Sequence, residues 1–147
     1  MFSGERASTR RSLLGFSTAA MLCLPAAAAQ TPSLVGFWLG QGQPGLAANI
    51  VYVTEIRADG TFTSEFRKYE NCRIVETNRE SGTWSLNGKV QEMVTTDVNG
   101  TRVNFGNTFT IELLTDTEQR ARLQKNDYLF VEKRLARFEF PPCQDGA

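Results

Sequence analysis

The sequence predicts an all-β protein: an antiparallel up-and-down β-barrel of eight or nine strands, with a β-sandwich as the alternative. Turn-forming pairs recur at short intervals, the runs between them are rich in Thr, Val, Ile and Phe, and helical periodicity is weak. Such pairs favour the positive φ angles of two-residue hairpin turns. Consecutive hairpins lose their exposed edges by closing into a barrel. The pairs are Asp59-Gly60, Asn87-Gly88, Asn99-Gly100, Gly106-Asn107 and Asn126-Asp127.

The expected strands of the first half have an inner and an outer face. Residues 34–40 form the first strand, and residues 41–48 form a loop that is long enough to cover a barrel mouth. In residues 49–57 and 61–69 the charges fall on one set of alternating positions, so the other set faces the core. This inner set comprises Ile50, Tyr52, Thr54, Ile56, Phe62, Ser64 and Phe66.

The second half continues the pattern of short strands and tight turns. Trp84 and Leu86 share one face of their expected strand, and Val103 and Phe105 point inward in theirs. The chain passes from strand to strand without a long crossover, which favours the meander over a Greek key. The remaining expected strands are residues 82–86, 89–98, 101–105, 108–113, 120–125 and 128–133.

The first 29 residues differ in composition from the rest and predict a signal peptide. A basic start with Arg6, Arg10 and Arg11 is followed by a short apolar run and four alanines. The run is shorter than the roughly 20 apolar residues that span a bilayer. We therefore expect cleavage before Gln30 and no transmembrane segment, with a buried N-terminal helix as the alternative.

The signal also suggests an export route. Arg10-Arg11 and the residues around it resemble the twin-arginine signal, which directs export of folded proteins, and an ordinary Sec signal is the alternative. Cys23 follows a leucine, so we expect it to leave with the signal and to carry no lipid. Residues 30–147 then form a single domain that is periplasmic or secreted.

Charge and composition exclude several function classes. The chain has 16 basic and 16 acidic residues, but three bases and one acid lie in the first 29, so the exported part is mildly acidic. This argues against nucleic acid as a partner, because nucleic-acid binders present basic surfaces. Histidine is absent, which removes Ser-His-Asp catalysis and His-ligated metals. We expect no catalytic residue, no metal site and no cofactor.

Two cysteines, Cys72 and Cys143, remain after removal of the signal. An even number of cysteines in an exported chain predicts a disulfide, and a reduced pair is the alternative. Such a bond closes a long loop, which the chain-entropy model values at roughly 4 kcal/mol.

Three motifs resemble those of the small bacterial lipocalin-like (calycin-type) proteins, which run Gly-x-Trp, Asp-Gly-Thr-Phe and Gly-x-Trp in this order. The resemblance covers about residues 34–134 and implies an eight-stranded up-and-down barrel, in agreement with the strand pattern. The motifs are Gly36-Phe37-Trp38, Asp59-Gly60-Thr61-Phe62 and Gly82-Thr83-Trp84-Ser85.

The resemblance also implies two structural contacts. In many lipocalins a basic residue near the end of the last strand packs over the first-strand tryptophan, which assigns Arg134 to Trp38, with Lys133 as the alternative. A contact of this kind contributes about 0.5–2 kcal/mol. The family often ties a mid-barrel strand to the C-terminal tail by a disulfide, and Cys72 with Cys143 fits that arrangement.

An eight-stranded barrel has room inside for packed side chains or for one small ligand. The expected ligand site in the interior comprises Tyr52, Thr54, Phe62, Ser64, Phe66 and Trp84. The alternative is a plugged barrel, in which these residues pack with Phe105, Phe109 and Phe130 as an ordinary core.

The predicted function is the binding of a small apolar or amphipathic molecule without catalysis. One alternative is a protein-interaction module, such as a periplasmic hydrolase inhibitor that inserts residues 30–33 or the 41–48 loop into its partner. The other is a barrel isomerase or cyclase that uses Tyr52 or a carboxylate. An inward ionisable group with a strongly shifted pKa favours the enzyme.

Overall fold

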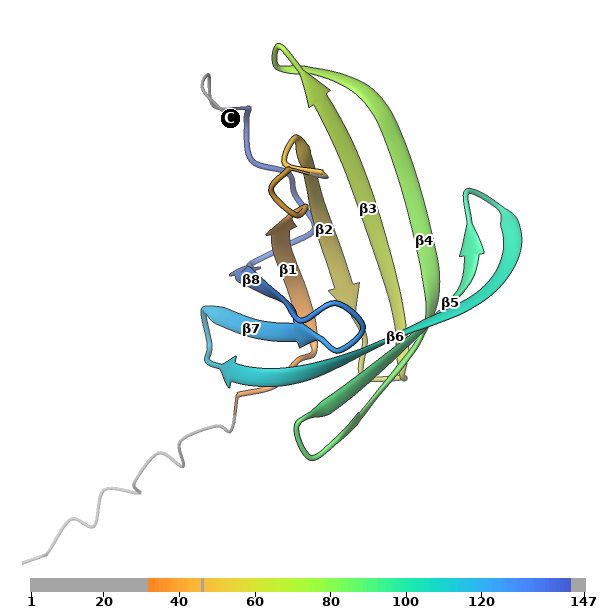
Figure 1. Cartoon of the computed structure of the whole chain (residues 1–147), viewed down its shortest axis with the longest axis vertical. Helices are drawn as coiled ribbons and strands as arrows, with labels where there is room; N and C mark the ends of the chain where they lie inside the picture. The colour runs from red at the N-terminus through yellow and green to blue at the C-terminus, as the bar shows by residue number, and fades with distance from the viewer. Residues whose placement is uncertain (1–31, 46, 144–147) are drawn as a thin grey trace, which may run out of the picture. The chain divides into compact units, whose positions relative to one another are not determined.

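The computed structural model describes residues 32–45 and 47–143, which form eight strands and no helix. The strands pair antiparallel in chain order, and β8 (Tyr128–Leu135) closes on β1 (Gly36–Gln41) to complete a barrel (Figure 1). The predicted up-and-down barrel is confirmed, and the sandwich alternative is wrong. The expected signal peptide, residues 1–29, lies outside the described residues, as do Gln30 and Thr31.

Two strands are longer than the sequence pattern indicates. Residues 73–81 extend the fourth strand. Gly106-Asn107 lies inside the sixth strand instead of forming a turn, so two expected strands are one and the described barrel has eight strands. Gly106 pairs with Val94 across the ladder, and this pairing overrides its local turn preference. The other strands are β2 (Ile50–Ile56), β3 (Thr61–Glu70), β4 (Arg73–Asn87), β5 (Val90–Val98), β6 (Thr101–Leu114) and β7 (Glu118–Leu123).

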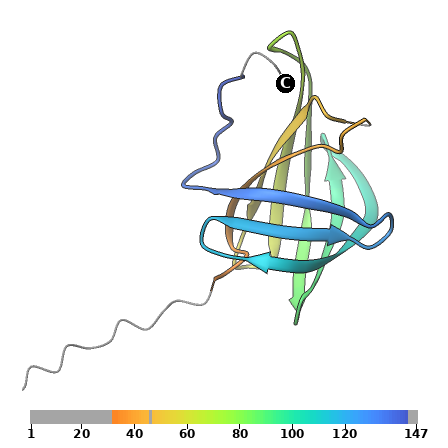
Figure 2. The ribbon, with the colours of Figure 1, turned by 60° about the vertical axis from the view of Figure 1, so that its left-hand side comes forward.

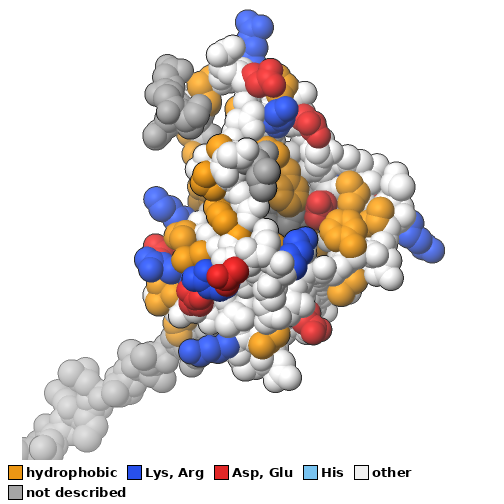
Figure 3. Space-filling view, in the orientation of Figure 1, with side chains coloured by type: hydrophobic (Ala, Val, Ile, Leu, Met, Phe, Trp, Pro, Cys, Tyr) orange, Lys and Arg blue, Asp and Glu red, His pale blue; other side chains and the backbone are white. Residues whose placement is uncertain are grey.

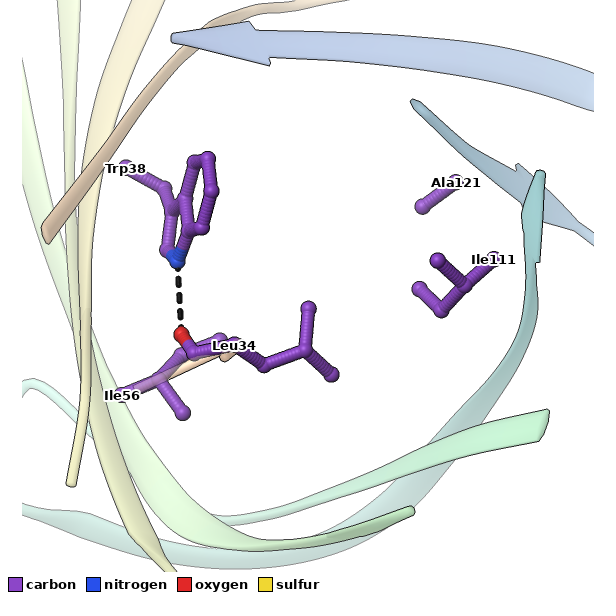
Figure 4. Close-up of a cluster of buried hydrophobic side chains, with 5 residues drawn as sticks. All are labelled: Leu34, Trp38, Ile56, Ile111 and Ala121. Atoms are coloured by element: carbon purple, nitrogen blue, oxygen red, sulfur yellow. Dashed lines mark hydrogen bonds between the residues drawn. The ribbon is translucent and has the colours of Figure 1, made fainter. Parts of the chain in front are cut away.

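One end of the barrel is closed by a hydrophobic core (Figure 4). Trp38 is completely buried there, and its indole Nε1 donates a hydrogen bond to the Leu34 carbonyl oxygen at 2.7 Å. A buried tryptophan removes about 150–250 Å² from water, worth roughly 4–6 kcal/mol. The core comprises Leu34, Trp38, Ile56, Ile111 and Ala121, with Trp84, Phe109 and Leu114 packed against it.

Arg134 covers the Trp38 ring, as the resemblance implies. Its guanidinium carbon lies 4.2 Å from the ring centroid, and its Nη1 donates to the Val35 carbonyl oxygen at 2.8 Å. Lys133, the alternative, is exposed. Gly36 permits this arrangement, because its φ is +141° and a Cβ there would overlap Arg134 Nη1. The Gly-x-Trp motif therefore has a steric reason in this chain.

The C-terminal strap, residues 136–143, runs along the outside of the barrel from β8 toward the β3–β4 turn (Figure 2). Cys143 forms the expected disulfide with Cys72 in that turn, with the Cα atoms 5.5 Å apart. Along the strap, the Phe140 ring lies 3.8 Å below the Arg67 guanidinium, and Phe138 packs edge-on against Phe37. The strap thus covers the outer faces of β1 and β3.

Two residues on the outer face are buried although strand alternation alone predicts that they are exposed. Val53 shares the outer face with charged residues, yet it is completely buried. Its neighbour across β3, Glu65, is also buried and forms ion pairs with Arg67 at 2.7 Å and Arg79 at 2.6 Å. Burial raises the pKa of Glu65, but hydrogen bonds from Arg79 and Arg67 outweigh it and leave that pKa below its usual range.

Candidate functional site

Beyond the closed end, the barrel contains a cavity of about 170 Å³. Side chains from β2 to β8 line it. The interior is therefore packed with side chains at one end and hollow beyond it. It has features of both predicted arrangements, the plugged barrel and the barrel with an interior site. In the space-filling view, a recess bordered by apolar and acidic side chains opens on the face toward the viewer (Figure 3).

Five of the six residues expected at the ligand site lie along this cavity: Tyr52, Thr54, Phe62, Ser64 and Phe66. Thr54 and Ser64 are buried and joined by a hydrogen bond of 2.8 Å between their hydroxyl oxygens. Their mutual bond satisfies two polar groups on an otherwise aromatic wall.

Two inward assignments need correction. Trp84 does not line the cavity, because its position opposite Gly60 at the β2–β3 turn places it against the closed-end core. Its Nε1 donates to the Arg57 carbonyl oxygen at 2.8 Å, so its role is structural. Phe105 is 44% exposed. It lies toward the β5–β6 turn, where the hairpin bends away from the rest of the barrel (Figure 1).

Sequence reasoning missed the polar side of the cavity. The signal was present, since Glu132 lies two positions from the inward Phe130, and Gln119 lies two positions from Ala121. The predicted ligand site includes none of these polar side chains. The cavity residues missed in this way are Glu80, Gln91, Thr95, Asn107, Gln119 and Glu132.

Glu132 is the centre of a buried hydrogen-bond network. It accepts a hydrogen bond from Gln119 Nε2 and another from the Tyr52 hydroxyl. Gly40 on β1 makes the second bond feasible, because a Cβ there would overlap the Tyr52 ring and hydroxyl. The missing side chain at Gly40 leaves room for the phenol to lie across β1 and reach β8.

Burial controls the ionisation of these groups. Desolvation raises the pKa of Glu132 from 4.5 to about 7, and the hydrogen bond from Tyr52 only partly opposes it. Burial, together with the charge of Glu132, raises the pKa of Tyr52, so the phenol remains a neutral donor. Desolvation also raises the pKa of Glu80, whose Oε2 accepts a weak bond from Thr95 Oγ1 at 3.4 Å.

Two buried amide atoms on the cavity wall have no hydrogen-bond partner within the described part of the chain. They are Gln91 Nε2, a donor, and Gln119 Oε1, an acceptor; the side chains are 2% and 3% exposed. A buried polar atom left without a partner costs about 1–3 kcal/mol. Such atoms beside a cavity are groups that a polar ligand can satisfy.

Aromatic rings also line the cavity. Tyr52 lies 5.4 Å from Phe66 and 6.4 Å from Phe130 between ring centroids, and Phe109 lies 6.0 Å from Phe130. These spacings fall within the range of favourable ring contacts, so the rings form one continuous surface.

A second hollow, of about 600 Å³, lies outside the barrel between the C-terminal strap and β1. Leu39, Val51 and Tyr69 form its floor, and Pro141 and Pro142 belong to the strap. None of the buried unpartnered amide atoms faces this groove. The interior cavity is therefore the better candidate for specific recognition.

Other kinds of site find no support in residues 32–45 and 47–143. No three Cys, Asp or Glu side chains there are grouped so as to hold a metal ion. In the same ranges there is no helix of the length and apolarity needed to cross a membrane.

No family model matches the chain. A search of curated proteins also found no match.

Proposed function

We propose that this protein is an exported, lipocalin-like barrel that binds one small amphipathic molecule in its interior and does not act on it chemically. The observation that carries this proposal is the cavity of about 170 Å³, which is lined both by aromatic rings and by two buried amides with an unpartnered atom. An engineered apolar cavity of about 150 Å³ admits benzene. The interior therefore suits a single ring with a short polar substituent.

Kinship and compartment are part of the same proposal. The closed barrel, with Trp38 under Arg134 and Gly36 beneath it, supports the lipocalin-like relationship. The disulfide between Cys72 and Cys143 supports export, because such bonds persist mainly in oxidising compartments.

Native mass spectrometry of the protein purified from its own host tests the proposal. We expect a small-molecule adduct on the wild type. Ala121→Leu places a larger side chain in the cavity and is expected to abolish the adduct. Ala136→Leu makes the same change on the exposed start of the strap and is expected to leave the adduct in place. Near-ultraviolet circular dichroism checks that both variants keep the native packing.

An adduct that survives Ala121→Leu, or its absence from wild type purified under several mild conditions, contradicts interior binding. A stoichiometric protein adduct favours the protein-interaction alternative, through residues 30–33 or the 41–48 loop.

One observation favours the enzyme alternative. Glu132 is an inward carboxyl group with a pKa near neutrality, and it lies beside the Tyr52 hydroxyl. Such a pair can exchange a proton with a bound substrate. Chemical analysis of the ligand after prolonged incubation with the protein separates the functions: a carrier returns it unchanged, and an isomerase or cyclase returns a product.

A further inference from the structure

The charged groups on the cavity wall are all acidic. Glu80 faces the cavity from β4 and Glu132 faces it from β8, and the wall includes no lysine or arginine. Neither carboxylate belongs to an ion pair between described residues. Of the two basic residues that follow Glu132 on β8, Lys133 is exposed, and Arg134 is engaged by Trp38 and by backbone carbonyl oxygens.

A buried carboxylate without a cationic partner is unfavourable, since its lost hydration is not replaced. Glu132 is 8% exposed and has only neutral hydrogen-bond donors, from Gln119 and Tyr52. A ligand that carries a positive charge would supply the missing partner.

The aromatic wall suits the same ligand. The rings of Tyr52, Phe66 and Phe130 contact one another and line the cavity together with Glu132. The negative face of an aromatic ring attracts an ammonium group, and the attraction is stronger where water is excluded. The rings also bury the apolar part of the ligand.

The two unpartnered amide atoms indicate which hydrogen-bonding groups the ligand carries. Gln119 Oε1 can accept a hydrogen bond from an ammonium N–H, and Gln91 Nε2 can donate to an acceptor elsewhere on the ligand. Both are buried and lie on different strands, β7 and β5, and Gln119 is also tied to Glu132 through its Nε2.

From the acidic wall, the aromatic rings and the unpartnered amides, we infer that the ligand of this cavity is a small organic cation. It is a primary or secondary amine with one ring and a hydrogen-bond acceptor. Its ammonium group binds Glu132 and Gln119 Oε1, and Gln91 contacts the acceptor. This inference rests on the proposed interior binding and narrows it to one chemical class.

Amine binding is coupled to the ionisation of Glu132. Among the titratable groups, Tyr52 from β2 interacts with Glu132, and Glu80 from β4 lines the same cavity. Arg134, two positions further along β8, is held over Trp38. The ammonium group binds the carboxylate form, so below neutral pH binding must first release a proton. The amine affinity then falls by up to about tenfold per pH unit.

Calorimetric titration with matched probes tests the inference. Benzylamine and benzyl alcohol have the same shape, and only the amine is charged. For the wild type at pH 8 we expect benzylamine to bind at least tenfold more tightly than the alcohol. Glu132→Gln is expected to remove this preference. Glu112→Gln, which alters an exposed carboxylate paired with Arg122, is the matched control and is expected to retain it.

The outcomes separate the inference from the function on which it rests. Equal affinities of the two probes, or an amine preference that survives Glu132→Gln, overturn the cationic ligand and leave interior binding standing. If neither probe binds at millimolar concentration and the native protein carries no adduct, interior binding itself fails. Loss of the preference only in Glu132→Gln, together with a pH dependence that this variant lacks, supports the inference.

Discussion

Glu132→Gln is expected to make the protein more stable at neutral and higher pH, although it removes a buried hydrogen-bonded carboxylate. The folded protein holds the Glu132 proton with a pKa of about 7, against 4.5 for an ordinary glutamate. Because the folded state binds this proton more tightly than the unfolded chain, raising the pH from below 4.5 to above 7 removes stability. At about 1.4 kcal/mol per pKa unit the full loss is about 3 kcal/mol.

Glutamine has nearly the same shape and does not titrate, so the variant escapes this loss. The stability difference is the unfolding free energy of the variant minus that of the wild type. It should grow by about 2.5 kcal/mol between pH 5 and pH 8. Urea unfolding, followed by the fluorescence of Trp38 and Trp84, measures this difference. Glu112→Gln is the control: the hydrogen bond from Arg122 lowers the pKa of Glu112, so the free-energy difference for this variant should not grow as the pH rises. If the difference in unfolding free energy between Glu132→Gln and the wild type did not change with pH, Glu132 would not be a buried carboxylate without a cationic partner.

Three further substitutions test the parts of the barrel that position the cavity. Gly40→Ala places a methyl group on the Tyr52 phenol and should destabilise the protein by about 1–3 kcal/mol in urea, whereas Gly106→Ala, which meets only ordinary contacts, changes stability by less than about 1 kcal/mol. Equal effects would show that Gly40 has no steric role. Arg134→Met removes the contact with Trp38 and the bond to Val35, and should lower the urea unfolding free energy by about 2–3 kcal/mol. The exposed Arg120→Met is its control, and a similar loss there would contradict this assignment. The double variant Cys72→Ser with Cys143→Ser opens a loop that spans 71 residues and should lose about 4 kcal/mol in the same assay. It should also increase proteolysis of the strap, and an unchanged cleavage rate would show that the strap is held without the disulfide.

The barrel was predictable because alternation marks a strand that has one face in a core. In residues 50–56 and 61–66 the charged and aromatic positions alternate regularly, and the Asp59-Gly60 turn fixes their pairing. Residues 73–81 carry no such apolar pattern. They form a strand because β3 offers a hydrogen-bonding partner along its whole length, which is a tertiary cause.

The candidate site was predictable only on its aromatic side. Tyr52 and Phe66 follow directly from alternation, but Glu132 requires accepting that a charged residue can share the inner face of Phe130. The strap reaches β3 through Phe140 and lies beside the β3–β4 turn through the distant disulfide. No local pattern encodes such a contact.

The proposed function requires that a small molecule binds inside the barrel beside Glu132. Locating the bound ligand in the folded protein tests this most directly. Intermolecular nuclear Overhauser effects can be measured between benzylamine and the isotopically labelled protein. The account predicts contacts from the ligand ring to Phe66 and Phe130. Contacts to Tyr69 and Pro141 in the outer groove, or none at saturating ligand, would contradict it.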